Sequence, residues 1–233
     1  MNNDALKTKW ARHLLGQGIG YPSEGVVRIF KGRFPRLALD PSRYRSMRVC
    51  DVGFGDGRNL VLLQECGFDV YGIDISQEVV EHVSSGLERR GIQARLKVGE
   101  NKSIPFEDGF FDCLLAWHTS YYVNAAGDFP RHVAEFARVL KPGGLLVAAI
   151  PMRTNYIYQD IRPLENGYCQ VNSTPHHVQD GQILRVFSDQ NEIRKEFEPF
   201  FKDFVFARAE SDFFGLAWND HMFICERKGL RHA

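Results

Sequence analysis

From about residue 47 onward, short apolar runs alternate with stretches in which apolar residues recur at helical spacing. The apolar runs predict strands at 47–53, 69–74, 93–98, 111–117 and 145–150. Between them, the spacing predicts helices at 58–66, 77–90 and 129–140, the second with Ser76 as its N-cap. Nearly continuous apolar strands separated by helices are typical of a parallel sheet that is covered on both faces. We therefore predict a doubly wound α/β fold with a mostly parallel sheet.

Two segments fall outside this alternation, residues 1–46 and residues 151–188. The first contains an arginine-rich stretch, and the second is rich in Tyr, His, Arg, Asn and Pro and predicts no regular element. We expect both to lie as lids over the carboxyl edge of the sheet, where doubly wound folds bind ligands. A helix is expected to begin near Asp189, and a hairpin of strands at 204–209 and 221–226 is expected to close one edge of the sheet.

The composition indicates how many domains to expect and which partners not to expect. The 233 residues show no compositional shift, which predicts one domain at 47–233, with 1–46 as an N-terminal cap and 151–188 as a lid on the acceptor site. Lys plus Arg and Asp plus Glu both number 29, so no overall field attracts a polyanion and nucleic acid is not expected as a partner. The apolar runs are too short to span a bilayer and the N-terminus is polar, so we expect a cytoplasmic protein without membrane contact.

The cysteines predict neither a disulfide framework nor a metal site. They are odd in number and lack C-x-x-C spacing, and three of them lie inside apolar runs. We therefore expect reduced, buried thiols at Cys50, Cys66, Cys113, Cys169 and Cys225.

The most informative stretch is 49–60, in which a strand leads through a glycine-rich turn into a helix. Gly53, Gly55 and Gly57 stand at alternate positions, where glycine lets the backbone turn tightly and approach a ligand, and the helix that follows offers unpaired N–H groups. A dinucleotide-binding turn would have its third glycine at the place of Arg58, so the spacing weakens that interpretation.

Two acidic residues frame the turn. Asp51 precedes the first glycine by two positions, where a carboxylate suits the amino group of a cationic ligand better than a pyrophosphate. Asp74 ends the next strand, where an acid can accept hydrogen bonds from both ribose hydroxyls of an adenosine.

With these residues the chain resembles the class I S-adenosylmethionine-dependent methyltransferase family over roughly residues 47–150. The motifs, in order, are Asp51-Val-Gly-Phe-Gly-Asp-Gly57, Tyr71-Gly-Ile-Asp74, Gly99-Glu100, Ile104-Pro105-Phe106, Phe111-Asp112 and Leu140-Lys-Pro-Gly-Gly144. The resemblance implies a seven-stranded sheet with an antiparallel last strand and S-adenosylmethionine as the cofactor. It implies that the three glycines wrap the methionine end. The other implied cofactor-binding residues are Asp51, Phe54, Asp74, Ile75, Glu100, Asn101 and Trp117, although the family more often has Asp at the position of Glu100.

Methyl transfer from a sulfonium requires an acceptor lone pair held in line with the methyl carbon, and a protonated acceptor also requires a base. Histidine suits that role near neutral pH, so the candidate catalytic residues are His118, His177 and the phenol of Tyr122. His118 has an alternative role, which is to pack beside the cofactor without catalysing anything. The candidate acceptor-binding residues are Tyr21, Tyr121, Arg153, Tyr156, His176 and Arg185.

The arginines of the insert suggest an anionic acceptor. Arginine binds carboxylates and phosphates through a planar fork, so Arg153, Arg162 and Arg185 could form a pocket with the two histidines. Simple solvation on the surface is the alternative for each of them.

The main interpretation is a methyltransferase that acts on an O or N atom of a small metabolite. The chain lacks the Pro-Pro-aromatic and Pro-Cys motifs of resembling nucleic-acid methyltransferases, and no metal-ligand cluster has suitable spacing. Two alternatives remain open: a protein methyltransferase or non-catalytic adenosylmethionine-binding protein, and an NAD-dependent oxidoreductase. The identity of the acceptor and the oligomeric state stay open.

Overall fold

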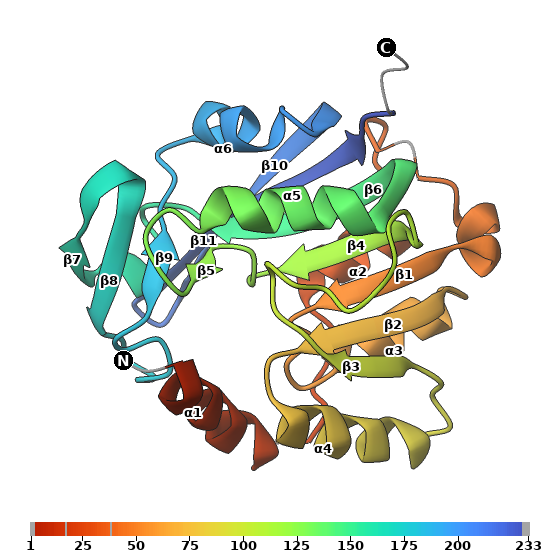
Figure 1. Cartoon of the computed structure of the whole chain (residues 1–233), viewed down its shortest axis with the longest axis horizontal. Helices are drawn as coiled ribbons and strands as arrows, with labels where there is room; N and C mark the ends of the chain where they lie inside the picture. The colour runs from red at the N-terminus through yellow and green to blue at the C-terminus, as the bar shows by residue number, and fades with distance from the viewer. Residues whose placement is uncertain (1–2, 17, 38, 230–233) are drawn as a thin grey trace.

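The computed structural model describes residues 3–16, 18–37 and 39–229, with side chains described from residue 7 onward. Its centre is a seven-stranded sheet with the order β10-β11-β6-β4-β1-β2-β3 (Figure 1). Strand β11 runs antiparallel to its neighbours β6 and β10, and the other pairs are parallel. The strands are β1 (Arg48–Val52), β2 (Asp69–Asp74), β3 (Arg95–Val98), β4 (Phe111–Trp117), β6 (Leu140–Pro151), β10 (Phe201–Phe213) and β11 (Leu216–Arg227). The predicted sheet with an antiparallel last strand is confirmed.

Helices cover both faces of this sheet. One face packs against α5 and α6, and the other packs against α2, α3 and α4. The helices are α1 (Asn3–Leu15), α2 (Glu24–Lys31), α3 (Arg58–Glu65), α4 (Gln77–Glu88), α5 (Phe129–Val139) and α6 (Gln190–Phe197). The predicted N-cap is confirmed, because the Ser76 side chain accepts a hydrogen bond from the backbone N–H of Val79.

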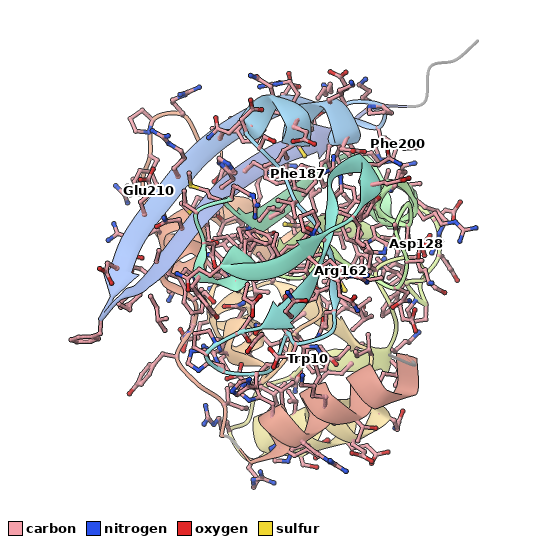
Figure 2. All side chains as sticks on the ribbon, turned by 90° about the vertical axis from the view of Figure 1, so that its left-hand side faces the viewer. Trp10, Asp128, Arg162, Phe187, Phe200 and Glu210 are labelled. Atoms are coloured by element: carbon pink, nitrogen blue, oxygen red, sulfur yellow. The ribbon has the colours of Figure 1, made fainter. Side chains whose placement is uncertain are left out.

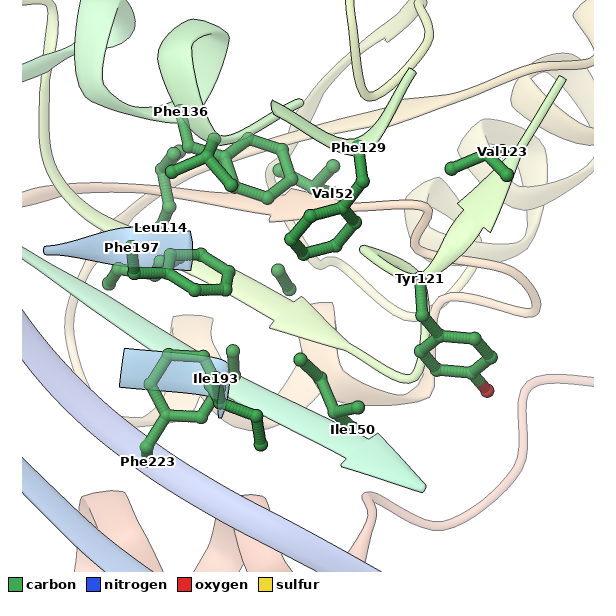
Figure 3. Packing of buried hydrophobic residues seen from close by; sticks show 14 of the residues in the cluster. Val52, Leu114, Tyr121, Val123, Phe129, Phe136, Ile150, Ile193, Phe197 and Phe223 are labelled. Atoms are coloured by element: carbon green, nitrogen blue, oxygen red, sulfur yellow. The ribbon is translucent and has the colours of Figure 1, made fainter. Parts of the chain in front are cut away.

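The alternation of side chains along β4 shows why the strands are apolar throughout. Leu114 and Ala116 belong to the core on the α5 side, whereas Cys113 and Leu115 belong to the core on the α3 side. Figure 3 shows the first core, in which Phe129 of α5 and Phe197 of α6 lie edge to face with ring centroids 5.7 Å apart. All five cysteines are free thiols and four of them are buried, while Cys66 is half-buried.

The segment 151–188 is not irregular, and the prediction of a structureless insert is wrong. It contributes three strands of a second, antiparallel sheet with the order β5-β9-β8-β7, and short η2 (Tyr156–Tyr158) and η3 (Glu165–Gly167) turns. These strands are too short and too polar for an alternation of apolar and polar residues to be recognised in the sequence. They are β5 (Tyr122–Val123), β7 (Asp160–Pro163), β8 (Tyr168–Ser173) and β9 (Ile183–Arg185).

The N-terminal segment and the last hairpin flank the carboxyl edge of the main sheet. Helix α1 lies beside α4 at this edge, close to the small sheet (Figure 1), and a 3-10 turn, η1 (Pro41–Ser46), precedes β1. The β10–β11 hairpin is confirmed but is longer than predicted, and its tip, between Phe213 and Leu216, protrudes from the body beyond the labelled Glu210 (Figure 2). Within the described part of the chain, no helix has both the length and the hydropathy that crossing a bilayer requires.

Candidate functional site

A cavity opens at the carboxyl edge of the sheet, between the ends of β1, β2 and β4, helix α1 and the small sheet. It brings together eight of the predicted site residues: Gly53, Gly55, Asp74, Ile75, Glu100, Asn101, His118 and Tyr122. Residues that were not predicted complete it, among them Trp10, Leu14, Thr119, His132 and Gln182.

The glycine turn shapes the floor of this cavity. Gly53 and Gly55 have positive φ angles of 69° and 58°, a conformation that side chains rarely adopt. A Cβ on Gly53 would lie 2.4 Å from the Thr119 hydroxyl oxygen, whereas a Cβ on Gly55 would meet only Leu14, at 4.0 Å. The turn therefore packs closely against Thr119 at Gly53, whereas open space lies next to Gly55.

Three predicted cofactor residues support the cavity without lining it. Gly57, with a φ of 80°, is the N-cap of α3, and a Cβ there would lie 2.6 Å from a methyl carbon of Val83. Phe54 is buried in the core on the α3 side. The Trp117 ring lies against Gly25 of α2, where a Cβ would be 2.5 Å from it.

Two buried carboxyl groups stand beside the turn. Asp74 accepts hydrogen bonds from the backbone N–H groups of Gly55, at 3.1 Å, and Ser76, at 3.4 Å, yet burial raises its pKa to about 6. Asp51 is 1% exposed, and its Oδ2 atom has no hydrogen-bond partner in the described residues. Burial and the charges of Asp74 and Asp56 raise the pKa of Asp51 to about 8. A cationic group beside Asp51 would relieve this unpaired buried acid.

Glu100 and Asn101 lie at the far side of the cavity and already have protein partners. The carboxylate of Glu100 accepts from the ammonium of Lys7 at 3.2 Å and from the Asn124 amide at 3.3 Å. The side-chain amide of Asn101 donates to the backbone oxygen of Thr119 at 2.8 Å. The Lys7 ion pair ties helix α1 to the rim of the cavity.

His118 lies where the end of β4 meets the cavity, in a left-handed conformation with φ 57°. Non-glycine residues adopt this conformation rarely, and such strained positions cluster at functional sites. The Nε2 atom of His118 lies 2.9 Å from Oδ2 of Asp220, which is 4% exposed. Asp220 was not predicted, because 102 positions separate it from His118. The only feature of the sequence that marks Asp220 is that this acid directly precedes the predicted strand 221–226.

Aromatic residues surround this histidine. The Trp218 ring centroid lies 6.0 Å from that of His118 and 5.4 Å from that of Tyr156. Tyr122 stacks on Tyr121 at 4.6 Å, and burial raises the pKa of Tyr122 to about 12, so its phenol stays protonated at neutral pH. Tyr122 therefore suits packing or hydrogen bonding rather than proton abstraction.

Other predicted residues lie away from the cavity. His177 is exposed and bonded to Asp180 at 2.8 Å, and His176 is an exposed neighbour of Tyr156, with ring centroids 6.0 Å apart. Tyr21 is 92% exposed. Neither histidine of the insert reaches the turn that holds His118.

The expected basic pocket does not form among the described residues. Arg185 is buried and paired with Glu192 and Glu196, at 2.7 and 2.9 Å. Arg162 is exposed on the small sheet and donates to Gln170 (Figure 2), while Arg153 is exposed above the Tyr158 ring. None of the three arginines lines the cavity, so the geometry gives no support to the hypothesis of an anionic acceptor.

Comparisons with known proteins agree with this geometry. Residues 50–148 match a family model described as a methyltransferase domain. The chain is 32% identical over 98 residues to an uncharacterised methyltransferase of Bacillus subtilis, covering 42% of this chain and 38% of that protein. It is 29% identical over 183 residues to a demethylmenaquinone methyltransferase of Corynebacterium efficiens, covering 75% and 74% of the two chains.

A solved structure shares the fold. The 1,6-didemethyltoxoflavin-N1-methyltransferase of Burkholderia thailandensis superposes with a TM-score of 0.57 at 15% identity, covering 96% of this chain and 91% of that chain. The first curated relatives match the chain over less than half of their own length. Over residues 50–148, which contain the glycine turn and its two acids, the chain is similar to methyltransferase domains, and the sheet with its antiparallel last strand agrees with that similarity.

Proposed function

We propose that this protein transfers a methyl group from S-adenosylmethionine to an oxygen or nitrogen atom of a small aromatic molecule. The observation that carries the cofactor is the buried carboxyl oxygen of Asp51, which has no hydrogen-bond partner among the described residues and belongs to the strand that leads into the glycine turn. S-adenosylmethionine has both an amino group and ribose hydroxyls, and the site offers one acid for each. The electrophilic sulfonium of S-adenosylmethionine carries the methyl group that is transferred.

Different residues of the chain would bind different parts of S-adenosylmethionine. Asp51 would hold the amino group, and Asp74, which Gly55 and Ser76 already orient, would accept hydrogen bonds from the ribose. Ile75 lines the cavity as an apolar surface for the adenine. Trp10 and Leu14 of α1 would cover the bound molecule and exclude water.

Two observations support a small aromatic acceptor. Trp218 lies next to His118 and packs against Tyr156, and aromatic side chains favour flat, apolar ligands. The Corynebacterium relative is named for demethylmenaquinone, and the Burkholderia structure contains 1,6-didemethyltoxoflavin together with S-adenosylhomocysteine.

Calorimetric titration with S-adenosylhomocysteine tests the cofactor. We expect binding by the wild type and at least about a tenfold weaker affinity for Asp74→Ala, because hydrogen bonds to a charged acceptor contribute about 1.5–3 kcal/mol. Asp69→Ala is the matched control, since Asp69 begins the same strand but is only half-buried and is paired with Arg95. Equal loss in both variants, or binding of NADH in place of S-adenosylhomocysteine, would contradict the proposal.

A screen for turnover tests the acceptor class. Protein that binds the cofactor is mixed with S-adenosylmethionine and with phenols, hydroxyquinones, aromatic amines or peptides, and S-adenosylhomocysteine is measured. We expect product with at least one small aromatic compound. Product with peptides alone would favour a protein methyltransferase, and binding without turnover in any mixture would favour a non-catalytic binding protein.

A further inference from the structure

The pair formed by His118 and Asp220 spans the main sheet. His118 follows the last residue of β4, Asp220 lies within β11, and β6 runs between these two strands. Asp220 faces Pro151 at the end of β6, so its carboxylate sits at the same edge as the cavity. Its side chain is 6% exposed, which makes the 2.9 Å contact with His118 a largely desolvated one.

The geometry determines which ring nitrogen carries the proton. An ionised carboxylate only accepts hydrogen bonds, so Nε2 of His118 must be the donor in its contact with Asp220 Oδ2. In the neutral ring, Nδ1 then has a free lone pair. No hydrogen-bond partner of Nδ1 occurs among the residues that the structure describes, and His118 lines the cavity. The ring is therefore arranged to accept a proton through Nδ1.

A second contact holds the acid in place. The Asn155 amide nitrogen donates to the backbone oxygen of Asn219 at 3.0 Å and lies 3.4 Å from the other carboxylate oxygen of Asp220. Asn155 is itself 3% exposed. Asp220 is thus bonded on both oxygens, once to the ring and once to the turn before η2.

The tyrosines around this acid are uncharged. Burial raises the pKa of Tyr156, and the pKa values of Tyr121 and Tyr158 are raised well above the ordinary value by the same cause. The charge of Asp220 adds to this effect in all three. The negative charge of the cluster therefore belongs to Asp220, and a proton taken up by His118 would be stabilised by it.

We propose that Asp220 is a positioning residue that holds His118 as the general base for acceptors that lose a proton on methylation, which are phenolic or other hydroxyl groups and protonated amines. This inference rests on the proposed function. In the balanced step the acceptor atom bonds to the methyl carbon, the electron pair of the breaking carbon–sulfur bond returns to sulfur, and the acceptor proton moves to Nδ1 of His118. Asp220 gains no proton, and it stabilises the resulting imidazolium.

Nuclear magnetic resonance of protein labelled at its eight histidines tests this without an acceptor. Spectra are recorded against pH with S-adenosylhomocysteine present, and the signal that is missing in His118→Gln is assigned to His118. In the wild type we expect the neutral ring to carry its proton on Nε2. A proton on Nδ1 would overturn the proposal whatever the variants do.

The matched pair Asp220→Asn and Glu210→Gln then isolates the charge. Both substitutions remove a carboxylate from the same hairpin at nearly constant size, but Glu210 is exposed. We expect Asp220→Asn to weaken the preference of the neutral His118 ring for a proton on Nε2, because an amide, unlike a carboxylate, can donate as well as accept a hydrogen bond there. We expect no change of tautomer in Glu210→Gln. An unchanged tautomer preference in Asp220→Asn would overturn the role of Asp220.

Kinetics with a compound from the acceptor screen give the second readout. We expect His118→Gln to lower kcat by about 10²–10⁴-fold without changing affinity for S-adenosylhomocysteine. Asp220→Asn should lower kcat while leaving the KM for the acceptor unchanged, a split that a merely structural role would not produce. An unchanged kcat in His118→Gln would contradict the general base, whereas loss of cofactor binding in the wild type would contradict the proposed function instead.

Discussion

The indole of Trp10 stands edge-on to the phenol ring of Tyr122, with ring centroids 5.8 Å apart and an angle of 90° between the planes. This contact joins helix α1, on which Figure 2 labels Trp10, to strand β5, and both residues line the cavity. The ion pair between Lys7 and Glu100 fastens the same helix to the rim. Helix α1 therefore covers the place proposed for the cofactor.

Replacing Trp10 by Ala should weaken the binding of S-adenosylhomocysteine about three- to tenfold and speed its dissociation. An aromatic pair contributes about 0.5–1.5 kcal/mol beyond the area it buries, and its loss would loosen the cover. Calorimetry and stopped-flow dissociation measure the two effects. Arg12→Ala is the control, because Arg12 lies on the exposed side of the same helix. Equal affinities for the two variants would show that α1 does not act as a cover.

The two glycines of the turn should respond differently to alanine. Gly53→Ala adds a strained φ and a Cβ 2.4 Å from the Thr119 hydroxyl, so we expect a loss of stability of about 2–4 kcal/mol. Gly55→Ala has the strained φ alone, at about 1 kcal/mol, but its methyl group would occupy the cavity. Denaturant unfolding should rank Gly53→Ala as the less stable variant. Calorimetry should show at least about tenfold weaker cofactor binding for Gly55→Ala, and normal binding by this variant would contradict the proposed placement of the ligand.

The stability of the ligand-free protein should depend on the protonation of Asp51. Burial raises its pKa to about 8, whereas in the unfolded chain an aspartic acid ionises near pH 4. The protonated acid thus stabilises the folded state below about pH 4, and this contribution is lost as pH rises to about 8. Asp74, with a pKa of about 6, acts in the same direction over the lower part of this range.

Asp51→Asn should therefore unfold at a temperature a few degrees above that of the wild type at pH 8, and near the wild-type value at pH 4. Circular dichroism at constant ionic strength measures both midpoints. Asp69→Asn is the control, because Asp69 is only half-buried and lies on a neighbouring strand. A variant that loses stability toward pH 8 as steeply as the wild type would show that Asp51 is not the responsible group.

The part of the site formed by residues close together in the sequence could be predicted. The part formed by contacts between residues far apart in the sequence could not. The boundaries of β2 and β4 agree with the apolar runs at 69–74 and 111–117, because residues buried on both faces leave a continuous signal. The glycine turn is equally local. Asp220, in contrast, reaches His118 only because β11 lies two strands away from β4 in the sheet. No local sequence pattern around either residue predicts that strand order.

The small sheet escaped prediction for a related reason. Strand β5 has two residues and pairs with β9, which lies some sixty positions later, so neither strand has a period of its own. Their pairing places Tyr122 at the cavity and, one residue beyond Leu184, turns Arg185 away from it. An arginine in an insert looked like a ligand-binding residue, whereas burial beside two glutamates makes it part of the framework.

Arg185→Ala should accordingly reduce stability and leave acceptor recognition intact. The guanidinium is 5% exposed and pairs with Glu192 and Glu196 of α6, which are about a third exposed, so its removal leaves two carboxylates close together without the cation between them, although Glu192 keeps its hydrogen bond from the Ser188 N–H. We expect a loss of about 2–3 kcal/mol, below the full value for a buried pair because water screens the glutamates. Denaturant unfolding measures this loss, and Arg162→Ala on the exposed side of the small sheet is the control. A variant that stays as stable as the wild type but shows a raised KM for the acceptor would return Arg185 to the binding site, because only direct contact with the acceptor would separate the two readouts in that way.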